Sequence, residues 1–195
     1  IWGMPSMKIL LIAGGWSSER EVSLTGARGM QEALLKRGHA VTFFDLLENF
    51  DELLETARQH DFALINLHGS PGEDGLVQAM LEKADCPYQG SGPSGSFLAL
   101  NKAAAKQIFR MAGLPTADWE FLPVRPAEGW EPRLPWPLFV KTTTGGSSLR
   151  LGRATNRQEL DALMDEIFAA GEGVLIEPQL PGKEITCGIL GEEAM

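Results

Sequence analysis

The residues best placed to do chemistry lie in the stretch from Ala13 to Ser23, Ala-Gly-Gly-Trp-Ser-Ser-Glu-Arg-Glu-Val-Ser. The stretch follows branched apolar residues and precedes helical spacing, so it lies where a strand is followed by a helix, a common ligand position in α/β proteins. Gly14 and Gly15 allow a tight turn, and the amides that begin a helix favour a negative group. Glu19 could offer its carboxylate to a substrate ammonium group, or it could be a solvated residue of the first helical turn. The G-x-G-x-x-G spacing of a dinucleotide site is absent.

A second candidate stretch begins at Lys141 and continues through Thr-Thr-Thr-Gly-Gly-Ser-Ser at 142–148. Hydroxyls, small residues and exposed amides are typical of loops that cover a polyphosphate. No Gly-Lys-Ser/Thr follows the glycines, so this is not a Walker loop. An ordinary hairpin turn, with Lys102 and Lys141 as solvated lysines, explains the same residues, and composition leaves both interpretations open.

The first half of the chain must position the glycine turn. The pattern predicts strands at Met7–Ala13, Val41–Phe44 and Phe62–Leu67, and helices at Leu24–Lys36, Asp51–Gln59 and Gly75–Ala84. Strands separated by helices of this length predict a parallel, doubly wound α/β sheet. Because the first and third strands then end at one edge, we expect Glu19 to lie near His68 and Glu73.

The second half shows a different pattern after the small-residue cluster Ser91–Ser96, which we interpret as the boundary of the first unit. We expect a helix that is capped by Asn101 and ends near Met111, followed by a hairpin of Leu138–Lys141 with Leu149–Arg153. A second helix is expected to begin at a Thr155/Gln158 capping box and to end near Ala170. Two further strands are expected at Val174–Glu177 and Glu184–Leu190. This is an α+β pattern, so the sequence predicts two domains.

Composition excludes several classes of protein. The 195 residues are 44% hydrophobic, enough for a core, and 17 basic against 26 acidic residues argue against a nucleic-acid partner. No apolar run reaches the roughly 20 residues of a membrane helix, and no signal-peptide pattern is seen, so we expect a cytoplasmic protein without membrane contact. Cys86 and Cys187 lack ligand spacing and are expected to be reduced core thiols. Ile1–Ser6 is interpreted as a leader before a natural start at Met7.

Several motifs follow one another from Met7 to the last residue: Gly-Gly-Trp-Ser-Ser-Glu-Arg-Glu-Val-Ser (14–23), Leu-His-Gly-Ser-Pro-Gly-Glu-Asp-Gly (67–75), Pro-Tyr-Gln-Gly-Ser-Gly (87–92), Asn-Lys (101–102), Ala-Gly-Leu-Pro (112–115), Phe-Val-Lys (139–141), Gly-Ser-Ser (146–148) and Leu-Ile-Glu-Pro-Gln-Leu-Pro-Gly-Lys-Glu-Ile-Thr (175–186). With these motifs in this order, the chain resembles the D-alanine–D-alanine ligases of the ATP-grasp superfamily. The resemblance implies a parallel, doubly wound pre-ATP-grasp domain at 7–95 and a central α+β ATP-grasp subdomain at 96–195.

The resemblance also implies a role for each matching residue. Glu19 would hold the ammonium of the first D-alanine, Ser147 would organise that pocket, and Gly15, His68 and Glu73 would support it. Lys102, Lys141 and the loop residues Gly146 and Ser148 would contact the ATP phosphates. Glu177 and the backbone near Leu180 would bind adenine, and Glu184 the ribose hydroxyls, in keeping with their hydrogen-bonding groups.

The implied reaction forms an acyl phosphate from ATP and one D-alanine, which the amine of a second D-alanine then attacks, for peptidoglycan synthesis. The implied cofactors are ATP with Mg²⁺ or Mn²⁺, and the implied oligomeric state is a homodimer. The family's metal ligands belong to a C-terminal lobe that this chain lacks, so we expect either part of a full ligase or a natural short form that binds ligand without catalysis. Thr142 and Leu149-Arg150 depart from the family pattern. A related D-amino acid or depsipeptide ligase is therefore an alternative.

Overall fold

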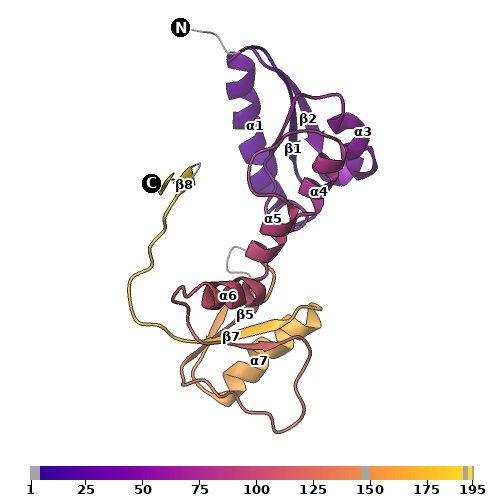
Figure 1. Cartoon of the computed structure of the whole chain (residues 1–195). Coiled ribbons are helices and arrows are strands. Elements are labelled where there is room, and N and C mark those ends of the chain that lie inside the picture. Colours follow the sequence, from indigo (N-terminus) through magenta and orange to yellow (C-terminus); the bar gives the residue numbers. More distant parts are fainter. Residues whose placement is uncertain (1–4, 146–149, 191–192, 195) are drawn as a thin grey trace. The chain divides into compact units, whose positions relative to one another are not determined.

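The computed structural model describes residues 5–145, 150–190 and 193–194. The chain divides into two units (Figure 1). Unit 1 comprises Ile1–Pro115 with Thr142–Leu149, and unit 2 comprises Thr116–Lys141 with Arg150–Met195. Within the described part, no helix has both the length and the apolar character needed to cross a membrane.

Unit 1 is built on a three-stranded parallel sheet with the order β2-β1-β3, as the alternating pattern predicts. The strands are β1 (Lys8–Ala13), β2 (Ala40–Asp45) and β3 (Phe62–Ile65). The register sets Ala13 opposite Asp45, and Ile12 opposite both Phe44 and Ile65. The ends of all three strands therefore meet at the edge that carries the glycine turn.

Helices cover both faces of this sheet, which explains why β1 is apolar at nearly every position. Leu10 and Ile12 pack with residues of α3 (Leu53–Ala57) and α4 (Leu76–Lys83). Leu11 and Ala13 point to the other face and pack with Ala27 of α1 (Arg20–Lys36). Because successive side chains of β1 point to opposite faces of the sheet, this one strand contributes to two separate cores.

The free side of β3 is covered by residues 87–89. The Ala63 N–H donates to the Pro87 carbonyl at 2.8 Å, and Ala63 forms a bridge with Tyr88. The Gln89 side chain then accepts from the Ile65 N–H at 2.9 Å and donates to the Ile65 carbonyl at 2.6 Å. A side-chain amide thereby occupies the place of a neighbouring strand.

Two predicted helices of unit 1 differ from those in the structure. In place of the predicted helix Asp51–Gln59, the structure has α2 (Leu46–Asn49), a 3₁₀ turn (Phe50–Glu52) and α3. The helical region begins earlier than predicted because Asp45 caps α2, accepting from the Leu47 N–H at 3.1 Å. The first helix begins at Arg20, four residues before the predicted start.

The small-residue cluster Ser91–Ser96 overlaps a helix that the sequence pattern did not predict. It contains the start of helix α5 (Pro93–Leu100), whose first-turn proline has a backbone angle suited to helix initiation. The next helix, α6 (Lys102–Met111), is capped as predicted, since the Asn101 side chain accepts from the Ala104 N–H at 3.0 Å.

Unit 2 contains a four-stranded sheet with the order β4-β7-β5-β6. Its strands are β4 (Glu120–Leu122), β5 (Leu138–Thr142), β6 (Gly152–Ala154) and β7 (Val174–Pro178). The antiparallel pairing of β5 with β6 confirms the predicted hairpin, whereas β4 was not predicted. The core joins Leu138 and Val140 to Leu160, Met164 and Ile167 of α7 (Arg157–Ala169).

The predicted strand Glu184–Leu190 is wrong for most of its length. Only β8 (Ile189–Leu190) is extended and paired, with β9 (Glu193–Ala194), and residues 184–188 are exposed without regular structure. An apolar pattern forms a strand only where a partner strand is available. The same segment contains Cys187, which is exposed rather than in the core, while Cys86 is buried as predicted.

The N-terminal cap of α7 leads to a first testable prediction. The predicted capping box of Thr155 with Gln158 is wrong; Asn156 accepts from the Glu159 N–H at 3.0 Å, and the Glu159 carboxylate accepts from the Thr155 N–H at 2.6 Å. We expect Asn156→Ala to lower the free energy of unfolding by about 1 kcal/mol in urea denaturation. The exposed Gln158 is the matched control, and an equal loss in Gln158→Ala would contradict the observed cap.

Candidate functional site

The glycine turn of unit 1 is fixed by hydrogen bonds from two neighbouring elements. The Gly14 N–H donates to Ser23 Oγ of α1 at 2.8 Å, and that hydroxyl donates to the backbone carbonyl of Asn66, just after β3. The Asn66 side chain returns a hydrogen bond to the Ser23 carbonyl at 2.6 Å. Ser23 is fully buried, so these bonds join the ends of β1 and β3 to α1 without access of water.

Glu19 lies at the N-terminal cap position of α1, where its own backbone is held on both sides. Its N–H donates to Ser17 Oγ at 3.2 Å, and its carbonyl accepts from the Ser23 N–H at 3.0 Å. The side chain is half-buried. The turn therefore presents a carboxylate from a fixed backbone at the edge where the strands end.

Arg20 follows Glu19 and forms a two-pronged ion pair across the turn. Its Nη1 and Nη2 donate to the two carboxylate oxygens of Asp45 at 2.8 and 2.6 Å, and Nη1 also donates to the Gly15 carbonyl at 3.2 Å. The side chains are 25% and 12% exposed, so the pair is shielded from water more than a surface ion pair is. The hydrogen bonds from Arg20 lower the pKa of Asp45 below its ordinary value.

Gly14 leads to a second prediction, because the Arg20–Asp45 ion pair occupies the space that a side chain at position 14 would need. Its φ is +78°, and an added Cβ would collide with Arg20 Nη1 and Asp45 Oδ1. We expect Gly14→Ala to lower the free energy of unfolding by about 1–3 kcal/mol, through strain and a displaced ion pair. Gly29, in the same unit, has nothing within 4 Å of an added Cβ. Urea denaturation of Gly29→Ala is the control, and equal stability of the two variants would contradict the clash.

The loop after β3 carries His68 and Glu73 at the same edge of the sheet. The Glu73 carboxylate accepts from the Gly69 N–H at 2.9 Å, which closes the loop that begins at His68. A Cβ added to Gly69 would lie 3.5 Å from Cβ of Ser17, so this loop and the glycine turn are in close approach. His68 is half-buried and Glu73 is exposed.

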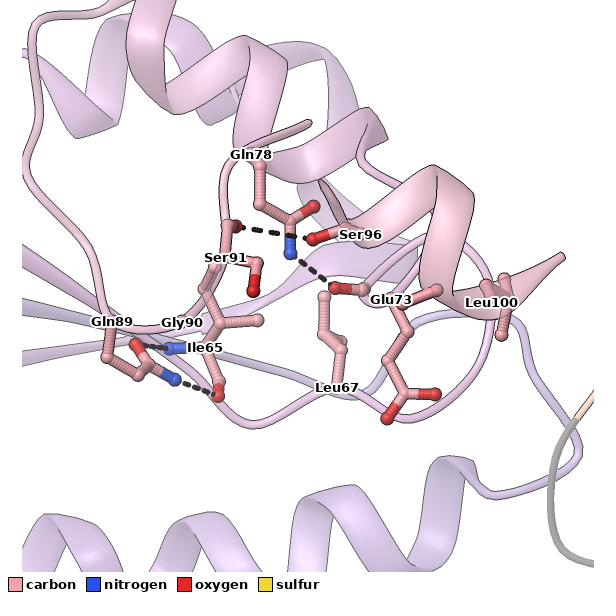
Figure 2. Close-up of a pocket in the computed structure, with 11 residues that line it drawn as sticks. Ile65, Leu67, Glu73, Gln78, Gln89, Gly90, Ser91, Ser96 and Leu100 are labelled. Atoms are coloured by element: carbon pink, nitrogen blue, oxygen red, sulfur yellow. Dashed lines mark hydrogen bonds between the residues drawn. The ribbon is translucent and has the colours of Figure 1, made fainter. Parts of the chain in front are cut away.

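A pocket of about 440 Å³ lies behind this loop in unit 1 (Figure 2). Apolar side chains, including Leu67 and Leu100, form part of its wall, with Glu73, Gln78 and Ser96 as polar members. Gln78 donates to the Gly72 carbonyl at 2.6 Å, while its Oε1 is buried with no hydrogen-bond partner among the described residues.

A second pocket, of about 430 Å³, lies in unit 2. It brings together four of the residues that the family resemblance selects: Lys141, Glu177, Leu180 and Glu184. Lys141 Nζ and the Glu177 carboxylate form an ion pair, with side chains 25% and 14% exposed. A half-buried cation, a half-buried carboxylate and the apolar side chains of Phe139 and Leu151 thus surround one space.

The remaining selected residues are Lys102, the first residue of α6, and residues of the segment that follows β5. Lys102, in unit 1, donates from Nζ to the Gly145 carbonyl at 2.5 Å and from its backbone N–H to the Thr143 carbonyl at 2.9 Å. The start of the threonine-glycine segment is therefore bound to the first turn of α6. Gly146, Ser147 and Ser148 fall outside the described residues.

Sequence reasoning missed several residues of these sites. Phe139 was not selected for the pocket, although β5 alternates between buried and half-buried positions and so places Phe139 and Lys141 on one face. Asp45 and Asn66 were missed because their partners are distant in sequence, and only the register of the sheet brings them to the turn.

Comparison with known proteins shows which proteins this chain resembles. A family model described as "D-ala D-ala ligase C-terminus" matches residues 107–195. A Desulfovibrio desulfuricans protein named D-alanine–D-alanine ligase is 74% identical over 189 residues, which is 97% of this chain. The chain is thus similar to proteins named D-alanine–D-alanine ligase over nearly its whole length.

Other proteins named D-alanine–D-alanine ligase resemble this chain in sequence and in fold. A ligase of that name from Nitratidesulfovibrio vulgaris is 61% identical over 97% of this chain. The crystal structure of a Bacillus anthracis D-alanine–D-alanine ligase complexed with ATP matches 93% of the chain with a TM-score of 0.83 and 35% identity. The α/β fold is therefore similar to that of this ligase. The chain spans 62% of the length of each of these three relatives.

Proposed function

We propose that this chain forms part of an ATP-dependent ligase that joins two D-alanines into D-alanyl-D-alanine for peptidoglycan precursor synthesis. The observation that carries the proposal is the pocket of unit 2, where Lys141, Glu177, Leu180 and Glu184 surround one space. The 74% identity to a protein named D-alanine–D-alanine ligase supports this choice of reaction.

The residues of the second pocket fit the parts of ATP. Phe139 and Leu151 offer apolar surface to a flat base, and the Glu177 carboxylate can accept from an exocyclic amino group. The exposed Glu184 carboxylate can accept from ribose hydroxyls. Lys141 then provides a positive charge for phosphate oxygens, and we assign Lys102, Gly146 and Ser148 to the same phosphates.

Mg²⁺ or Mn²⁺ is the metal we propose for the reaction. Among the described residues no group of three or more His, Cys, Asp or Glu side chains is arranged to hold a metal ion. These residues alone thus do not form a complete metal site.

Substrate binding in unit 1 depends on a negative charge at Glu19. Its carboxylate can hold the ammonium of the first D-alanine by charge-assisted hydrogen bonds. We assign Ser147 to the same pocket, with Gly15, His68 and Glu73 as supports. Glu73 does this through the Gly69 N–H, which keeps the His68 loop closed beside the turn.

ATP supplies the phosphoryl group that activates the carboxylate of the first D-alanine as an acyl phosphate. The contribution of this chain to that step is positioning and charge: lysines beside the phosphates, and a carboxylate that orients the amino acid. The amine of the second D-alanine then displaces phosphate and forms the peptide bond.

The organisation and setting of the enzyme are further parts of the proposal. We assign residues 7–95 to the substrate-binding domain and 96–195 to the central ATP-grasp subdomain, with a further lobe completing the ATP site. We also propose a cytoplasmic homodimer. The net charge of −9 is consistent with small-molecule substrates rather than nucleic acid.

The test is ADP release by the full-length protein that contains this chain, with ATP, Mg²⁺ and D-alanine. We expect one ADP for each dipeptide formed, and no release without D-alanine. Dipeptide formation with a second substrate other than D-alanine would indicate a related D-amino acid or depsipeptide ligase. Heat of ATP or D-alanine binding without turnover would indicate a non-catalytic binding protein and would overturn the proposal.

A further inference from the structure

We infer that Gln78 is a positioning residue of the proposed amino-acid site. Its side chain holds the loop of residues 67–73, and the glycine turn that carries Glu19 lies against this loop. The inference rests on the proposed function, because it takes Glu19, His68 and Glu73 as parts of the D-alanine site. Gln78 is buried and is not otherwise used in the proposed reaction.

The Gln78 side chain reaches the loop from helix α4 (Figure 2). Its Nε2 donates to the Gly72 carbonyl at 2.6 Å. The Gly72 N–H donates to the Gly69 carbonyl at 2.9 Å, and the Glu73 carboxylate accepts from the Gly69 N–H at 2.9 Å. One side chain of α4 therefore holds the closed turn that follows His68.

Gly72 packs directly against the start of the same loop. A Cβ added to Gly72 would collide with the Leu67 side chain and would lie 3.2 Å from Leu67 Cα. Leu67 also faces the glycine turn, since a Cβ added to Gly15 would lie 3.2 Å from Leu67 Cδ2 and 3.6 Å from Pro71 Cδ. Because close-packed groups transmit displacements, a shift of Gly72 is passed through Leu67 to the glycine turn.

The glycine turn connects this contact to Glu19. Ser17 approaches the loop at Gly69, where an added Cβ would lie 3.5 Å from Ser17 Cβ. Ser17 Oγ accepts from the Glu19 N–H at 3.2 Å. The backbone that presents the Glu19 carboxylate is thus held beside the loop that Gln78 fixes, so loss of the bond to Gly72 is expected to displace the carboxylate from its ligand.

Packing alone does not explain a glutamine at this position. Gln78 is 5% exposed, and its Oε1 has no hydrogen-bond partner in the part of the chain that the structure describes. Burying an amide oxygen without a partner costs free energy, and a methionine would fill a similar space without that cost. What the amide adds is the hydrogen bond to the Gly72 carbonyl.

The test compares Gln78→Met and Gln78→Glu in the full-length protein that contains this chain. Methionine has a similar length but no donor. A glutamic acid side chain can donate to the Gly72 carbonyl only while it is protonated, and burial favours the protonated form. The readouts are the dissociation constants for D-alanine and for a non-hydrolysable ATP analogue, by calorimetry, with the midpoint of thermal unfolding as the measure of folding.

We expect Gln78→Met to weaken D-alanine binding about tenfold, which is the effect of one hydrogen bond, and to leave binding of the ATP analogue within about twofold of wild type. Gln78→Glu should bind D-alanine within about threefold of wild type near pH 6 and progressively more weakly as the carboxyl group ionises. Each variant is compared with wild type at the same pH, so that titration of His68 and of D-alanine itself cancels.

Three results would overturn the role of Gln78. The first is D-alanine binding by Gln78→Met within about threefold of wild type, and the second is an equal loss of both ligands. The third is a loss in Gln78→Glu near pH 6 as large as that in Gln78→Met. Gln107→Met is the matched control, because it removes an exposed glutamine of α6 that accepts from Arg110 at 2.9 Å, and both constants should be unchanged.

The two proposals fail in different ways. A wild-type protein that binds and ligates no D-alanine would overturn the proposed function. A wild-type protein that is active, with Gln78→Met binding D-alanine as wild type does, would overturn only the role of Gln78.

Discussion

Glu19→Gln in the full-length protein is expected to weaken D-alanine binding by about 10- to 100-fold, as removing a charged hydrogen-bond acceptor costs about 1.5–3 kcal/mol. Glutamine has nearly the same shape and retains one acceptor, so the change isolates the charge. The backbone of Glu19 is held by Ser17 and Ser23 through groups that the substitution does not alter. The fold should therefore persist, with an unchanged thermal midpoint.

The discriminating measurement is a pair of dissociation constants, for D-alanine and for ATP, determined by calorimetry. We expect the constant for ATP to remain unchanged. Glu21→Gln is the matched control, since Glu21 lies in the first turn of α1 and is exposed. Equal loss of D-alanine and ATP binding would contradict the assignment of Glu19 to the ammonium group.

Lys141→Met is expected to produce the opposite pattern, with ATP binding weakened by about 10- to 100-fold and D-alanine binding preserved. Methionine keeps most of the apolar stem of lysine but removes its charge. The Lys141 side chain is one-quarter exposed and its ammonium pairs with Glu177 inside the second pocket, so the substitution removes a charge that water only partly screens. Lys141→Arg, which keeps the charge, should recover part of the affinity.

The control for Lys141 is another ion pair of unit 2. Arg125 pairs with Asp165 at 2.5 Å, and both side chains are 58% exposed. Arg125→Met should leave both dissociation constants unchanged, because exposed pairs contribute little and Arg125 does not line the pocket. Unaltered ATP binding in Lys141→Met would remove Lys141 from the phosphate site.

Local signals predicted local structure well. Asn101 was identified as a helix cap because the cap bond reaches only to Ala104, three residues away. The strand Lys8–Ala13 was evident because both of its faces are buried, which leaves a continuous apolar run. Each of these features depends on residues within one or two turns of the chain.

The errors arise where a distant partner decides the outcome. Residues 184–188 have a strand-like pattern but remain irregular and exposed, since a pattern does not supply a partner strand. The cap of α7 is a local exception: it is formed by Asn156 rather than Thr155, a shift of one residue that propensity does not resolve. The Arg20–Asp45 pair spans 25 positions and depends on the register of β2, which no short window contains.

The side chain of Gln89 has a consequence for how this protein behaves among copies of itself. An outer strand of a sheet presents unpaired N–H and C=O groups to which another chain can add as a new strand, and such additions lead to aggregates. Gln89 occupies both polar groups of Ile65 at the free side of β3 (Figure 2). With Pro87 bonded to Ala63, two successive attachment points are already taken. The β3 side of this sheet is thus closed to strand addition at these points by residues of the same chain, which protects the protein there from aggregation through added strands.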